Sequence, residues 1–267
     1  MTETTTVSTT HVQVSRRGAV GVIELSRPDK FNSMSRAALT AMQEAMDTFE
    51  QPDSGVRVVL VQAQGKHFCT GADLEEFKAM RGDTATLEDF LHHVHRTLGR
   101  LETSALPVVA AAQGLALAGG LEMLLVCDIV FAASDARFGD QHVQYGLVPA
   151  WGASQRLPRQ IGLRRSLDLM YSGRWIDAQT ALQWGLVNYI AEDGKLLDAA
   201  MEYCDALAAR SRPGVAAMKS LAREGLEGSL DAGLEMELNR VLEAMAGPDP
   251  AEGLAAFEAR RTPVFKG

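Results

Sequence analysis

Two patterns of hydrophobic residues alternate along the chain. Short runs of branched apolar residues occupy 12–25, 56–63, 107–112 and 127–133, and they predict strands, the first run forming a hairpin. Between them, stretches such as 33–49 carry apolar residues at helical spacing. Because the later runs are continuously apolar, they are typical of strands buried on both faces of a sheet. The sequence therefore predicts an α/β protein made of repeated β-β-α units.

The pattern changes after Pro149, where it becomes almost wholly helical apart from one apolar run at 186–190. Long amphipathic stretches follow, interrupted by Pro213 and Gly228. The N-terminus has neither the basic start nor the apolar stretch of a secretory signal. We expect three parts: a disordered tail at 1–10, a core at 11–195 and a helical C-terminal oligomerisation subdomain at 196–267.

Composition narrows the classes of function. The 267 residues are 46% hydrophobic, enough for one domain with a large core, and no apolar run approaches the roughly 20 residues that span a membrane. A net charge of -8 without any Lys/Arg-rich block argues against a nucleic-acid partner. Three scattered cysteines favour a reducing cytoplasm. The adjacent histidines His92, His93 and His95 face different directions on a helix, so we expect no metal site.

Two glycine-containing loops carry the chemistry. The segments 65–74 and 114–122 each follow an apolar run and precede a helical pattern, a junction that leaves backbone amides free. Gly119 and Gly120 have no side chains and permit close approach of a ligand. Together the loops could supply two N–H donors to one anionic oxygen. Neither has the spacing of a dinucleotide loop, a P-loop or a serine elbow.

Six segments, in this order, resemble the enoyl-CoA hydratase/isomerase (crotonase) superfamily: RPDKFNSMS, GKHFCTGADLEEF, AAQGLALAGGLEMLLVCDIVFAASDARFG, YGLVPAWGASQRLPRQIG, SGRWIDAQTALQWGLVN and RRTPVFKG. The resemblance runs from about residue 12 to residue 266. It implies a spiral of ββα units with a helical C-terminal subdomain, assembled as a homotrimer or a dimer of trimers. It also implies a coenzyme A thioester as substrate, no separate cofactor, and an oxyanion hole formed by the amides of Ala72 and Gly119.

The catalytic positions implied by the resemblance are Glu122 and His142. Glu122 matches the first glutamate of the family's hydratases, but His142 stands where they have the second. Histidine exchanges protons near neutral pH, so the two side chains could orient a water as base and acid. If 138–142 is helical, Asp140 lies about 200° around the axis from His142 and points away from the site. Ala150 replaces the acid of the dienoyl isomerases, which disfavours that activity.

The resemblance also assigns substrate contacts. Trp151 is expected to line the acyl pocket, and basic residues near both ends of the chain to approach the nucleotide phosphates. The positions implied for coenzyme A are Lys30, Ala72, Asp73, Leu74, Glu75, Gly119 and Lys266.

The leading functional hypothesis is an enoyl-CoA hydratase, a lyase that adds water to a 2-enoyl-CoA and stabilises a thioester enolate in the oxyanion hole. Two alternatives use the same site. One is hydrolytic C–C cleavage or isomerisation of an acyl-CoA by Glu122 and His142. The other is a catalytically weak acyl-CoA-binding protein that retains the fold.

Overall fold

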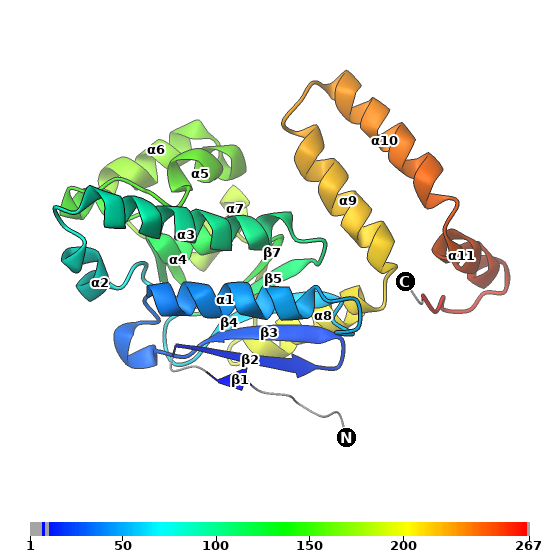
Figure 1. Ribbon diagram of the computed structural model, residues 1–267, viewed down its shortest axis with the longest axis horizontal. Helices are drawn as coiled ribbons and strands as arrows, with labels where there is room; N and C mark the ends of the chain where they lie inside the picture. The colour runs from blue at the N-terminus through cyan, green and yellow to red at the C-terminus, as the bar shows by residue number, and fades with distance from the viewer. Residues whose placement is uncertain (1–6, 9–10, 266–267) are drawn as a thin grey trace.

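A seven-stranded sheet forms the centre of the protein in a computed structural model that describes residues 7–8 and 11–265 (Figure 1). Its order is β1-β2-β3-β4-β5-β7-β10. The hairpin of β2 (Val12–Arg17) and β3 (Val20–Leu25) turns at Gly18, whose φ is 60°, as the sequence predicts. From β3 on, each strand is parallel to its neighbour: β4 (Val58–Ala63), β5 (Val108–Ala112), β7 (Ile129–Ala133) and β10 (Tyr189–Ala191).

A smaller, three-stranded sheet accounts for the ββα repeat. Its order is β6-β8-β9, from β6 (Leu115–Leu117), β8 (Arg137–Gly139) and β9 (Ile176–Asp177). In the middle of the chain, each repeat adds one strand to the large sheet and then a short strand to the small sheet. Strand β5 is followed by β6 and α4, and β7 is followed by β8. The predicted α/β spiral is confirmed.

Helices cover both faces of the large sheet (Figure 1). Val59 and Val61 face the core side shared with α1 (Arg36–Phe49) and α3 (Thr84–Thr103). Val58 and Leu60 face α8 (Leu196–Ala208). This double coverage explains why the strand sequences are continuously apolar. The other helices are η1 (Pro28–Lys30), α2 (Leu74–Ala79), α4 (Gly119–Leu124), η2 (His142–Tyr145), α5 (Ala153–Ile161), α6 (Leu163–Ser172) and α7 (Ala178–Trp184).

The chain ends in a helical arm that projects from the core (Figure 1). We define the arm as α9 (Arg212–Gly225), α10 (Leu230–Ala244) and α11 (Pro248–Glu258). The expected C-terminal unit began at residue 196, one helix earlier. That helix, α8, packs its apolar face on the sheet. The division of the chain into a core and an oligomerisation subdomain stays a prediction. None of the helices in the described chain has the length and apolar content that crossing a membrane requires.

Two residues of the expected N-terminal tail at 1–10 are described. Val7–Ser8 forms a two-residue strand, β1, that pairs antiparallel with β2. The remainder of the expected tail, residues 1–6 and 9–10, lies outside the described residues.

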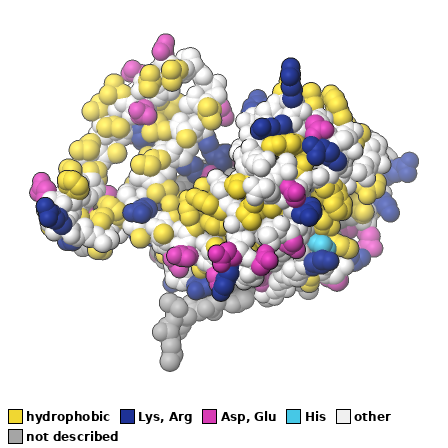
Figure 2. Space-filling view, turned by 180° about the vertical axis from the view of Figure 1, so that it is seen from behind, with side chains coloured by type: hydrophobic (Ala, Val, Ile, Leu, Met, Phe, Trp, Pro, Cys, Tyr) yellow, Lys and Arg dark blue, Asp and Glu magenta, His cyan; other side chains and the backbone are white. Residues whose placement is uncertain are grey.

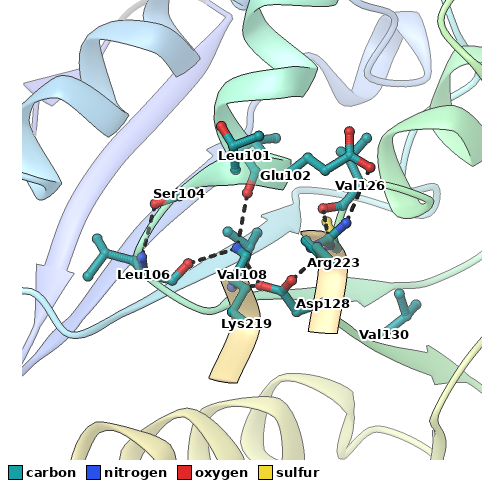
Figure 3. A network of polar contacts seen from close by, with 12 residues as sticks. Leu101, Glu102, Ser104, Leu106, Val108, Val126, Asp128, Val130, Lys219 and Arg223 are labelled. Atoms are coloured by element: carbon teal, nitrogen blue, oxygen red, sulfur yellow. Dashed lines mark hydrogen bonds and ion pairs between the residues drawn. The ribbon is translucent and has the colours of Figure 1, made fainter. Parts of the chain in front are cut away.

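Charged side chains attach α9 to the core (Figure 3). Lys219 Nζ lies 2.8 Å from Asp128 Oδ2 and also donates to the carbonyls of Leu101 and Leu106. Arg223 contacts Asp128 Oδ1 at 2.8 Å and Glu102 at 3.2 Å. Asp128 also accepts a hydrogen bond from the Val108 amide at the start of β5. The arm is thus attached through a carboxylate that two cations share.

Candidate active site

The two glycine loops meet side by side. Cys69 and Ala116 form a parallel bridge, and the Leu117 amide donates to the Cys69 carbonyl at 3.0 Å. A Cβ at Gly120 would lie 2.0 Å from that carbonyl oxygen, and one at Gly71 would lie 3.1 Å from the Gly119 nitrogen. The loops therefore come this close only because glycine occupies these positions.

Both amides expected to bind an anionic oxygen belong to these joined loops. Gly119 is the first residue of α4, where the backbone N–H has no acceptor within the helix. Around Ala72, the Met34 amide donates to the Gly71 carbonyl and the Asp73 amide donates to the Met34 carbonyl. Since neighbouring amides of an extended chain point in opposite directions, the Ala72 N–H points away from Met34. Among the described residues, both N–H groups thus lie outside the backbone hydrogen bonds that join the loops.

Glu122 is buried on α4, with 1% of its surface exposed. Its Oε1 accepts hydrogen bonds from the Trp151 amide at 2.8 Å and the Ala153 amide at 2.9 Å. Among the described residues, its buried Oε2 has no hydrogen-bond partner. Burial raises the pKa of Glu122 to about 7, although the amides of Ala153 and Trp151 and the charge of His142 act in the opposite direction. A carboxyl group with this pKa can take up and release a proton at neutral pH.

His142 faces that carboxyl group from the first position of η2. Its Nε2 lies 3.8 Å from Glu122 Oε2, and its Nδ1 lies 3.0 Å from Asp140 Oδ1. Burial lowers the pKa of His142, but the hydrogen bond and charge of Asp140, together with the charge of Glu122, outweigh it and raise the pKa. The two predicted catalytic residues are therefore brought together, with an additional carboxylate behind the ring.

The position of Asp140 corrects the expectation that it points away. That expectation assumed a helix at 138–142, but β8 ends at Gly139 and Gln141 has a left-handed backbone, with φ of 65°. The chain turns back, and Asp140 also accepts from the His142 amide at 3.3 Å. An aspartate that accepts from the amide two residues on is a recognised turn signal. The sequence contained this turn signal in the aspartate of the segment Gly139-Asp140-Gln141-His142.

The ring of Trp151 packs against the loop that contains Gly119. Its side chain is 4% exposed, and a Cβ at Gly119 would lie 2.3 Å from its ring atom Cζ3. The Trp151 carbonyl accepts from Arg156, which forms an ion pair with Glu102. The ion pair of Arg156 with Glu102 and the amides that hold Glu122 were not found from sequence, because the partners in these contacts lie at least 29 residues apart along the chain and leave no local pattern.

Three of the positions implied for coenzyme A lie at the surface beside the Ala72 loop. Lys30 and Glu75 form an exposed ion pair at 3.4 Å, and Leu74 is 62% exposed. The Asp73 side chain is buried instead, where it caps α2 and pairs with Arg27 at 2.8 Å. Lys266 lies outside the described residues.

The histidines of α3 are engaged separately. His93 lies 3.1 Å from the Thr40 hydroxyl, and His95 Nε2 lies 2.8 Å from the Ala150 carbonyl oxygen. Within the described part of the chain, no group of three or more His, Cys, Asp or Glu side chains is placed to hold a metal ion.

Comparison with known proteins agrees with this architecture. A family model described as enoyl-CoA hydratase/isomerase matches residues 15–267. The chain is 32% identical over 257 residues to the short-chain-enoyl-CoA hydratase of Clostridium acetobutylicum, covering 96% of this chain and 98% of that one. It is 34% identical over 262 residues to the mitochondrial methylglutaconyl-CoA hydratase of Rattus norvegicus, covering 96% and 82%.

A solved enoyl-CoA hydratase from Bacillus anthracis superposes with a TM-score of 0.91 at 33% identity, covering 96% of this chain and 99% of that chain. The fold is an α/β spiral in which two glycine loops lie side by side. The chain belongs to the enoyl-CoA hydratase/isomerase family, which confirms the resemblance seen in the sequence.

Proposed function

We propose that the protein is an enoyl-CoA hydratase that adds water to the double bond of a 2-enoyl-CoA without a separate cofactor. The observation that carries this proposal is Glu122: a buried carboxyl group with a pKa of about 7, on the helix that begins at Gly119, with one oxygen free to face His142. The names of the aligned relatives support the substrate class.

The joined loops supply electrostatic stabilisation in this proposal. The thioester oxygen accepts hydrogen bonds from the amides of Ala72 and Gly119, and these strengthen as negative charge moves onto it in the enolate-like transition state. Loss of one such donor typically costs about 3 kcal/mol of transition-state stabilisation.

Proton transfer falls to the facing pair. Ionised Glu122 removes a proton from water while the water oxygen bonds to the β-carbon and the double-bond electrons move toward the thioester oxygen. Protonated His142 then gives the α-carbon its proton from Nε2. The proton held on Glu122 restores His142, across a gap of 3.8 Å between the two side chains. Water is thereby added without net gain or loss of protons.

The remaining assignments concern substrate contacts. We assign Trp151 to the acyl pocket because its ring covers Gly119, and a side chain this large there favours short acyl groups. Lys30, Leu74 and Glu75, exposed beside the Ala72 loop, together with Asp73 through its backbone, are assigned to coenzyme A, as is Lys266.

A second candidate reaction is hydrolytic C–C cleavage of a β-keto acyl-CoA. The contact between His142 and Asp140 favours it, because a carboxylate-backed imidazole is the usual arrangement for activating a nucleophile. His142 would deprotonate a water that attacks the ketone. The C–C bond then breaks, its electrons form a thioester enolate held by the same amides, and that enolate takes the proton from His142.

We also propose a cytoplasmic homotrimer or dimer of trimers, with the C-terminal helices as the oligomerisation surface. Side chains of the arm support this proposal, since Leu226, Leu230 and Phe257 are 88%, 77% and 83% exposed in the single chain. Figure 2 shows apolar side chains gathered over the arm, with a hollow between it and the core. Large contiguous apolar patches on a protein surface mark interaction sites.

An assay of crotonyl-CoA hydration tests the proposed activity. The loss of the absorbance of the conjugated thioester measures the reaction. Glu122→Gln keeps the volume and removes the base, so we expect kcat to fall at least ~100-fold while thioester affinity changes less than ~3-fold. Glu88→Gln, at an exposed site on α3, is the matched control. Cleavage of a β-keto acyl-CoA without crotonyl-CoA hydration would establish the second candidate. Binding without either turnover would establish an acyl-CoA-binding protein.

A further inference from the structure

Asp140 forms a buried contact that the proposed proton transfers do not use. The residue is 1% exposed, and its Oδ1 lies 3.0 Å from His142 Nδ1 and 3.3 Å from the His142 amide nitrogen. Within the described chain, its Oδ2 is buried without a hydrogen-bond partner. Burying a carboxylate this deeply is unfavourable unless a cation or donor offsets it. The donors that reach it here both belong to His142.

The local backbone fixes this contact. Gln141, between the two residues, adopts a left-handed conformation with φ of 65°, which is unfavourable for a residue with a side chain. Its amide nitrogen Nε2 donates to the Gly173 carbonyl at the end of α6, and the side chain is 7% exposed. Strained backbone persists where surrounding contacts enforce it, and it concentrates at functional sites. The turn directs the Asp140 carboxylate back onto the imidazole.

The chemistry of the two groups determines where the histidine proton sits. An ionised carboxylate only accepts hydrogen bonds, so the ring nitrogen beside it must carry hydrogen. A neutral imidazole then has its lone pair on the other nitrogen, here Nε2, which faces Glu122. The charged groups facing His142 are Asp140, from the end of β8, and Glu122, from α4.

We propose that Asp140 is a positioning residue that holds the neutral form of His142 as the Nδ1–H tautomer and directs Nε2 at the reacting groups. Glu122, His142 and Asp140 then form a chain in which only Nε2 exchanges protons with the substrate side. The inference rests on the proposed function for its catalytic consequence. The tautomer itself is a property of the protein without substrate.

Nitrogen-15 NMR of the full-length protein tests the tautomer directly. Long-range 1H–15N spectra distinguish Nδ1–H from Nε2–H, and the His142→Gln spectrum identifies the His142 signals among the 6 histidines. We expect neutral His142 to carry hydrogen on Nδ1. Hydrogen on Nε2 in the neutral form would overturn the proposal, whatever reaction the protein catalyses.

Asp140→Asn provides a second test, because this change preserves the shape of the side chain and removes its charge. We expect the proton affinity of His142 to fall at least ~10-fold and kcat to fall at least ~100-fold with KM changed less than ~3-fold. Asp140→Glu should recover part of the proton affinity. Asp135→Asn, at an exposed position before β8, should match the parent protein in both the proton affinity of His142 and kcat.

An unchanged titration and tautomer of His142 in Asp140→Asn would contradict the proposal. The expected tautomer in a protein that does not hydrate crotonyl-CoA would contradict only the proposed function.

Discussion

Glu122 makes the stability of the protein depend on pH. Burial moves the pKa of its carboxyl group from 4.5 to about 7 in the folded state. Between these values the folded protein holds a proton that the unfolded chain releases. The contribution of Glu122 to the free energy of unfolding is therefore fully present below pH 4.5 and is lost as pH rises through about 7. The raised pKa of His142 gives a loss in the same direction.

Glu122→Gln should therefore gain stability relative to the parent protein as pH rises. Glutamine is neutral at every pH and can still accept from the two amides. The difference in free energy of unfolding should favour the variant more at pH 8 than at pH 5, by up to about 3 kcal/mol, since one pH unit corresponds to about 1.4 kcal/mol. Urea unfolding at both pH values measures it. Glu88→Gln should show no such trend, and a pH-independent difference for Glu122→Gln would mean that the carboxyl pKa is not raised.

Among individual residues, the sequence predicted those that belong to a family motif. It missed those whose position depends on a local reversal of the backbone. Glu122 and His142 were predicted by resemblance, and the structure places them 3.8 Å apart. Asp140 was misplaced because a helix was assumed where a left-handed residue reverses the chain. Whether Ala72 and Gly119 bind the thioester oxygen stays a prediction, supported by the loop contacts.

Among the elements, the strands were the easiest to predict. Continuous apolar runs gave β4, β5 and β7 because both faces of the sheet are covered. Whether the C-terminal unit begins at residue 196 stays a prediction, since the sequence of an amphipathic helix such as α8 shows an apolar face without showing what covers it. The interruption at Pro213 was predicted correctly: it lies in the first turn of α9, where proline is tolerated.

The attachment of α9 should depend on Asp128. Asp128→Ala leaves Lys219, whose side chain is 9% exposed, and Arg223 without their shared carboxylate, and it removes the acceptor of the Val108 amide. Such a loss at a partly buried site should destabilise the protein by about 2 to 3 kcal/mol. Urea unfolding measures this, and limited proteolysis should cut faster before α9. The matched control is Asp198→Ala, whose exposed ion pair with Lys195 is worth less than about 1 kcal/mol. Equal effects of the two changes would mean that the network does not hold the arm.

The whole molecule has an arm that one chain leaves largely uncovered. A cavity of about 1490 Å³ lies between the arm and the core, lined by residues of α3, α5, α9 and α10 among others. Apart from the contacts of Lys219 and Arg223 with the core, the arm presents leucine, methionine and phenylalanine side chains to solvent. Most soluble oligomers are symmetric assemblies of identical chains, and such an assembly would cover this surface.

Light scattering at micromolar concentration should therefore give three or six times the 28.8 kDa chain mass. Phe257→Glu should shift the population toward monomer, because it places a charge in the proposed apolar interface. Phe257 is 83% exposed in the single chain, so the change should leave the helical circular dichroism of each protomer intact. Leu197→Glu, at a 44% exposed position on α8, is the matched control and should assemble as the parent does. A monomeric parent protein, or a Phe257→Glu variant that assembles fully, would show that the arm is not the oligomerisation surface.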